Sequence, residues 1–133
     1  MVLWVTMMWK VQWSGDSEKS VGSVGEVDSL LDQLHADGKP VMAVVESVSN
    51  GDSLAIGLGR DRSVLNYVPS SGDPPYYTSL GSDDRDEDVE FDFMGESSEF
   101  PMRNSVSIDA ARQAMRDFLD TGELSPIIEW EQD

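Results

Sequence analysis

The stretch VMAVVESVSNGDSLAIGL, residues 41–58, indicates the fold class of this chain. Residues 41–48 are mostly apolar and β-branched, which favours a strand. The pair Asn50-Gly51 is a strong signal for a tight hairpin because both positions tolerate a positive φ. Residues 53–58 then supply the return strand, and residues 64–68 a third. The sequence therefore predicts an antiparallel meander.

An amphipathic helix is predicted on each side of this meander. Ser23 and Glu26 have the spacing of a capping box, and apolar residues at helical intervals follow over residues 25–36. Ser105 or Ser107 can cap the second helix, and Gly122 marks its end. Its apolar stripe comprises Ile108, Ala111, Met115, Phe118 and Leu119.

Three further strands are expected from alternation, at residues 3–13, 89–93 and 126–130. Proline and glycine indicate loops over residues 69–81 and 95–104. We therefore expect an α+β fold in which an antiparallel sheet of about six strands packs against a single layer of two helices. At 133 residues, the length favours one domain over residues 1–133.

The net charge is the strongest indication in the sequence of what kind of partner the chain binds. There are 26 Asp and Glu against 9 Lys and Arg, a formal net charge of −17. Nine of the carboxylates lie between Asp83 and Glu99, where Arg85 is the only cation before residue 103. Such a surface repels nucleic acid and anionic membranes and attracts basic proteins. We expect a basic protein as partner, with no direct binding of nucleic acid or membrane.

The residues that catalysis or metal binding commonly needs are scarce. The chain has no Cys, which excludes disulfides and thiolate metal sites and fits a cytoplasmic location. His35 is the only histidine, and it falls at the expected exposed edge of a helix end. Gly57-Leu58-Gly59 lacks the lysine and following helix of a phosphate loop. No cofactor, no metal and no enzymatic activity are expected.

The sequence disfavours a calcium site, a signal peptide and a membrane-spanning segment. Residues 83–88 lack the alternating ligands and turn glycine of an EF-hand loop, which disfavours calcium. The N-terminus lacks the basic start and long apolar run of a signal peptide, and no stretch of about 20 apolar residues could span a membrane.

The acidic run and the tyrosine pair before it form the candidate contact surface. Tyrosine on an exposed loop is a common interface anchor, and carboxylates can pair with the arginines and lysines of a basic partner. The predicted partner-binding residues are Tyr76, Tyr77, Asp83, Asp84, Asp86, Glu87, Asp88, Glu90 and Asp92. The alternatives are a solvated acidic loop that only maintains solubility, and a tyrosine ring that folds back onto the core.

The order of segments resembles the Imm-one family of immunity proteins from bacterial polymorphic toxin systems. The similar segments are residues 26–34, 53–59, 63–67, 74–81 (PPYYTSLG), Val106, 108–119 and 124–131 (LSPIIEWE). The resemblance implies a small cytoplasmic antidote encoded beside its toxin. Several such toxins are similar to nucleic-acid deaminases, including enzymes that act on cytosine in double-stranded DNA.

This resemblance and the charge predict the same role. A deaminase must bind a polyanion and draw a base into its zinc pocket, so its working face should be basic. We expect the chain to neutralise a cognate toxin, of the DNA cytosine deaminase type, by occluding its active site or substrate groove. The alternatives are an acidic adaptor or DNA mimic that acts on another basic protein, and a hydrolase with paired carboxylates. The oligomeric state is left open.

Overall fold

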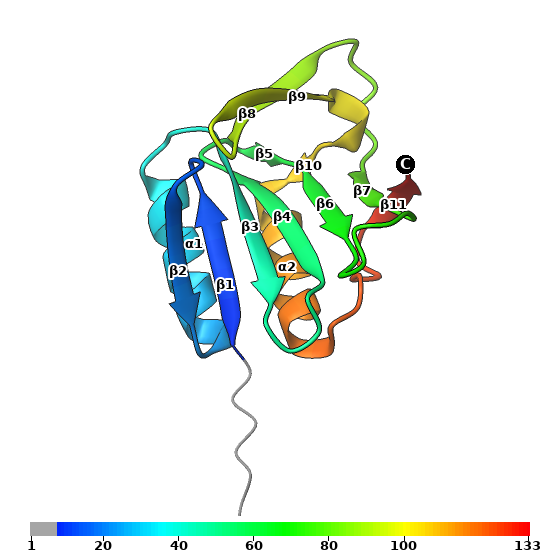
Figure 1. Cartoon of the computed structure of the whole chain (residues 1–133). Helices are drawn as coiled ribbons and strands as arrows, with labels where there is room; N and C mark the ends of the chain where they lie inside the picture. Colours follow the sequence, from blue (N-terminus) through cyan, green and yellow to red (C-terminus); the bar gives the residue numbers. More distant parts are fainter. Residues whose placement is uncertain (1–7) are drawn as a thin grey trace, which may run out of the picture.

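The computed structural model describes residues 8–133 as an α+β structure with a nine-stranded sheet, a two-stranded sheet and two α-helices (Figure 1). The helices are α1 (Val24–Ala36) and α2 (Ile108–Thr121). The large sheet comprises β1 (Trp9–Trp13), β2 (Ser17–Val21), β3 (Val41–Ser47), β4 (Ser53–Leu58), β6 (Leu65–Val68), β7 (Tyr77–Leu80), β8 (Asp88–Phe93), β9 (Glu96–Pro101) and β11 (Glu129–Gln132). The small sheet pairs β5 (Arg62–Ser63) with β10 (Val106–Ser107).

The predicted meander forms the centre of the large sheet. Strands run in the order β11-β7-β6-β4-β3-β1-β2, with β8 beside β3 and β9 beside β8. The predicted β3–β4 hairpin is confirmed and pairs Val45 with Leu54 and Val41 with Leu58. The tight turn expected at Asn50-Gly51 is wrong, because the N–H of Ser47 donates to the carbonyl of Asp52 and only Gly51 of the pair has a positive φ, of 78°. All these pairings are antiparallel except that of β8 with β3, which is parallel.

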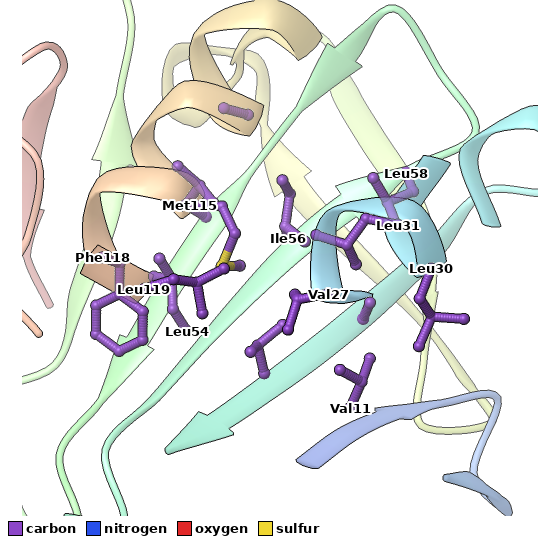
Figure 2. Close-up of a cluster of buried hydrophobic side chains, with 14 of the residues drawn as sticks. Val11, Val27, Leu30, Leu31, Leu54, Ile56, Leu58, Met115, Phe118 and Leu119 are labelled. Carbon is purple, nitrogen blue, oxygen red and sulfur yellow. The ribbon is translucent and has the colours of Figure 1, made fainter. Parts of the chain in front are cut away.

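Both helices pack on one face of the sheet, where the main hydrophobic core lies. Figure 2 shows Val27 and Leu31 of α1 and Met115 of α2 directed toward Ile56 of β4. Both predicted helices are confirmed, together with their caps. The backbone N–H of Glu26 donates to Ser23 Oγ (3.1 Å), and that of Ala110 donates to Ser107 Oγ (3.2 Å), so Ser107 and not Ser105 is the second cap.

The opposite face of the sheet is covered in part by the β8–β9 hairpin, at the end where β3 begins and β4 finishes (Figure 1). A second hydrophobic cluster fills this contact. It comprises Met42, Ala55, Val64, Val89, Phe91 and Met102. The predicted alternation of β8 is confirmed, since Val89 and Phe91 are buried and Glu90 is exposed.

Several expectations about strands and loops were wrong. The loop predicted over residues 69–81 contains β7, and the one over 95–104 contains β9 and a 3₁₀ turn. The sheet therefore has more strands than six, and β2 was not expected at all. These strands are short and mostly polar, so their sequences carry no apolar alternation. β2 and β9 form by pairing with the preceding strands β1 and β8, and β7 by pairing with the distant strand β11.

At the two ends of the chain the outcome is mixed. The last strand begins at Glu129 and not at residue 126. Of the strand expected over residues 3–13, β1 confirms 9–13, and the part before residue 8 lies outside the described residues. Neither helix between residues 8 and 133 is long and apolar enough to cross a membrane.

Candidate partner-binding surface

The β8–β9 hairpin presents a row of carboxylates on the side that points away from the core. Because Val89 and Phe91 point inward, the alternating residues 88, 90 and 92 point outward. The antiparallel register places Glu99 of β9 directly opposite Glu90. The acidic hairpin face is defined here as Asp88, Glu90, Asp92 and Glu99. None of its carboxylates belongs to a salt bridge formed within residues 8–133.

Asp92 differs from the other three because it is half-buried and closes the hairpin turn. The turn consists of Met94 and Gly95, with φ angles of 55° and 92°. The Oδ1 atom of Asp92 accepts a hydrogen bond of 2.8 Å from the N–H of Gly95. Asp88, Glu90 and Glu99 are exposed and are therefore the members of the acidic hairpin face that are free to meet a partner.

The acidic loop before β8 is partly neutralised by its own arginine. Arg85 donates to Asp83 at 2.7 Å and lies 3.6 Å from Glu87. Hydrogen bonds from the Arg85 side chain and backbone lower the pKa of Asp83 to about 2. Asp83 is half-buried in this arrangement, whereas Asp84 and Asp86 are exposed. The loop thus offers fewer free charges than its composition suggests.

Gly57 and Arg60 position the hairpin, a role that no local sequence pattern indicates. Gly57 of β4 lies under the Phe91 ring, where a Cβ atom would come within 2.6 Å of Phe91 Cζ. On the same ring, the guanidinium carbon of Arg60 lies 5.8 Å from the ring centroid, and Arg60 Nε donates to the carbonyl of Glu90 (2.9 Å). The hairpin is therefore held between a glycine and an arginine.

A groove of about 380 Å³ separates the acidic hairpin face from the turn before β5. It is lined by Arg60, Asp61, Arg62, Arg85, Asp88, Val89, Glu90 and Met102. Three of the chain's nine basic residues lie in this groove, so that positive and negative groups alternate within it. The candidate surface is thus mixed in charge at this edge and acidic over the outer strands.

The two tyrosines lie at the other end of β7 from the acidic loop. Tyr77 begins β7 and is half-buried, with its ring 6.3 Å from that of Tyr67, which itself lies 6.3 Å from Phe118. The Tyr76 hydroxyl donates to the carbonyl of Gly72. Tyr77 is therefore a half-buried residue of β7 whose ring lies beside that of Tyr67, and its role as an interface anchor stays a prediction.

His35 is not on an exposed edge, as was expected, but half-buried. Its Nδ1 atom accepts a hydrogen bond of 2.9 Å from the N–H of Gly59. This bond ties the end of α1 to the turn after β4. The signal from Gly57-Leu58-Gly59 is likewise structural, because Gly57 makes room for Phe91 and Gly59 has a φ of +91° close to the Lys39 carbonyl.

Comparison with known families agrees with the resemblance seen in the sequence. Residues 15–132 match the family model described as Immunity protein Imm1. The chain therefore belongs to the Imm1 family of immunity proteins, whose role implies a cognate toxin as partner. No curated protein sequence matches the chain.

Proposed function

We propose that this chain neutralises its cognate toxin by binding the toxin's basic substrate face through the acidic hairpin face. The observation that carries the proposal is that Asp88, Glu90 and Glu99 stand exposed on one side of the hairpin, with no Lys, Arg or His nitrogen of residues 8–133 within 4.0 Å of their carboxylate oxygens. Carboxylates without internal partners are free to accept charge-assisted hydrogen bonds from arginine and lysine.

We infer from the family resemblance that the toxin is a deaminase acting on cytosine in DNA, whose basic substrate face would be complementary to this acidic surface. Such an enzyme carries cations where the phosphates of its substrate bind. Carboxylates that occupy those cations exclude the nucleic acid without any chemistry. Inhibition is then stoichiometric, takes place in the cytoplasm, and needs no cofactor or catalytic residue from this chain.

The charge also determines how the complex forms. A net charge of −17 speeds the encounter with a basic partner, and this effect weakens as ionic strength rises. The lifetime of the complex depends on groups that become buried in the contact. We expect the association rate to fall with added salt and the dissociation rate to change much less.

The test uses the toxin polypeptide encoded beside this chain, inactivated at its catalytic residue. Asp88→Asn, Glu90→Gln and Glu99→Gln are combined in one variant, and Asp120→Asn, Glu123→Gln and Glu129→Gln form the control. Both sets remove three exposed carboxylates and change the net charge from −17 to −14. If rim charges contribute up to about 1 kcal/mol each, the hairpin variant should bind on the order of 10- to 100-fold more weakly.

The control variant should lose only the part of the affinity that depends on net charge. Equal binding by the two variants would place the interface elsewhere. A toxin that binds neither nucleic acid nor this chain would favour the alternative, an acidic adaptor or DNA mimic directed at another basic protein. Turnover of nucleotides, esters or glycosides that disappears with a single carboxylate would instead favour a hydrolase.

A further inference from the structure

We propose that Arg60 receives a carboxylate of the toxin, an Asp or Glu set within the toxin's basic face, and so fixes how the two proteins align. The inference rests on the proposed function, because it concerns the edge of the acidic hairpin face. In this contact the cation belongs to this chain and the carboxylate to the toxin, whereas the acidic hairpin face binds cations of the toxin.

The Arg60 side chain is held in place before any partner arrives. Its Nε atom donates to the carbonyl of Glu90 at 2.9 Å, and the guanidinium lies over the Phe91 ring at 5.8 Å from the centroid. Both contacts are on β8, so the guanidinium moves with the hairpin. An arginine that is already oriented loses less conformational entropy when it binds.

The two terminal nitrogens of Arg60 are free for a ligand. Within residues 8–133 they make no hydrogen bond, and no carboxylate lies within 4.0 Å of the side chain, although the protein has 26 acidic residues. Because Nε is occupied, the open edge of the guanidinium is the one formed by Nη1 and Nη2. That edge binds a carboxylate with two parallel hydrogen bonds.

The neighbouring arginines already have partners. Arg62 donates to the carbonyl and hydroxyl oxygens of Ser105 at 2.8 and 3.0 Å. Arg85 is bound to Asp83, and Arg103 to Glu131. In the groove between β5 and β8, Arg60 is therefore the arginine with its terminal nitrogens unpaired in the part of the chain that the structure describes.

The surrounding charge indicates what kind of ligand can reach this position. A small free anion is repelled by the net charge of −17 and by Asp61, Asp88 and Glu90 around the groove. A carboxylate on a basic protein surface can reach Arg60, because the cations around that carboxylate are attracted to the acidic groove. A basic protein without that carboxylate would leave Arg60 desolvated and unpaired, so the contact also discriminates against wrong partners.

The sign of the mutational effect tests the inference. Arg60→Ala and Lys19→Ala each make the net charge −18, and Lys19 is also exposed and without an ion pair among residues 8–133. Net charge alone would speed association with a basic toxin equally in both. We expect Lys19→Ala to bind as well as the parent or slightly better, and Arg60→Ala to dissociate at least 10-fold faster.

Two further measurements separate a direct contact from a support for the hairpin. Arg60→Lys keeps the charge but has no planar fork, so it should recover less than half of the lost binding free energy. Each Asp and Glu of the inactivated toxin is then changed to Ala and combined with Arg60→Ala. One of them should show a coupling of at least fivefold in Kd.

The inference is overturned if Arg60→Ala binds as tightly as Lys19→Ala, or if every toxin carboxylate acts additively with it. Additive losses would mean that Arg60 only braces Glu90 and Phe91. The proposed function fails separately, when the variant of Asp88, Glu90 and Glu99 binds no more weakly than its control.

Discussion

Phe91 packs directly over Gly57, and a Cβ atom on residue 57 would come within 2.6 Å of the Phe91 Cζ atom. The absence of a side chain in the middle of a buried strand is thus what allows the β8–β9 hairpin to lie on the sheet. The position of the acidic hairpin face depends on a residue that carries no charge.

Gly57→Ala should therefore destabilise the protein and move the hairpin. Overpacking of this kind costs about 1–3 kcal/mol, measurable as a lower urea midpoint with an unchanged slope. Gly25→Ala is the control, because it lies in α1 with its nearest neighbour, Ser23 Oγ, 4.0 Å away. That variant should gain up to about 1 kcal/mol from helix propensity. Similar stability changes in both would contradict the account of Phe91.

Glu90 and Glu99 are a directly opposed pair of like charges, and such pairs destabilise a hairpin. Glu99→Gln should raise the free energy of unfolding by about 0.2–1 kcal/mol. It should also slow association with the toxin, since one carboxylate of the acidic hairpin face is lost. Glu96→Gln, opposite Phe93, should leave stability unchanged. Urea unfolding and stopped-flow binding check both effects, and a destabilised Glu99→Gln protein would contradict the prediction.

The contact between the helices should make stability depend on pH. Partial burial raises the pKa of Asp28, but hydrogen bonds from Arg112 and Arg116 outweigh this and hold the pKa below its ordinary value. A lowered native pKa stabilises the folded state above the unfolded-state pKa near 3.8, and the contribution disappears as pH falls through the native value.

Asp28→Asn should accordingly cost about 1–3 kcal/mol at neutral pH, because the Arg112 side chain is only 8% exposed and loses a partner at 2.8 Å. The difference from the parent should be constant above about pH 5 and shrink below the unfolded-state pKa. Asp32→Asn is the control, with a side chain 67% exposed, and should cost less than about 1 kcal/mol. An Asp28→Asn effect that persists undiminished in strong acid would exclude the carboxylate as its source.

The two tyrosines should differ in what they contribute. Tyr77→Ala removes a ring that packs on Tyr67 and should lower stability by about 1–3 kcal/mol. Tyr76→Phe removes only the hydroxyl that donates to Gly72 and should cost about 1 kcal/mol or less. Thermal unfolding of the two variants distinguishes them. If Tyr77→Ala is fully stable and binds the toxin more weakly, the ring is an interface anchor after all.

The sequence alone determined the parts whose signals are local. Ser23 and Ser107 cap helices because their hydroxyl groups act within a single turn, and Gly51 provides a positive φ in the loop of the central hairpin. The alternation of β8 and the net charge also follow directly from the residues. These local signals predicted the α+β class, the acidic outer side of β8 and a basic partner.

Only the tertiary structure decided the rest. Strands β2, β7 and β9 are polar or very short, and hydrogen bonds from neighbouring strands hold them: β7 pairs with the distant strand β11, while β2 and β9 pair with the strands directly before them, β1 and β8. Glu99 joins the acidic hairpin face through that pairing, and Arg60 gains its orientation from a strand about 30 residues further along the chain. The pairing of β7 with β11 and the contact of Arg60 with Glu90 depend on long-range packing. Short polar strands also leave no apolar periodicity in the sequence, whereas caps and alternating strands leave local signals.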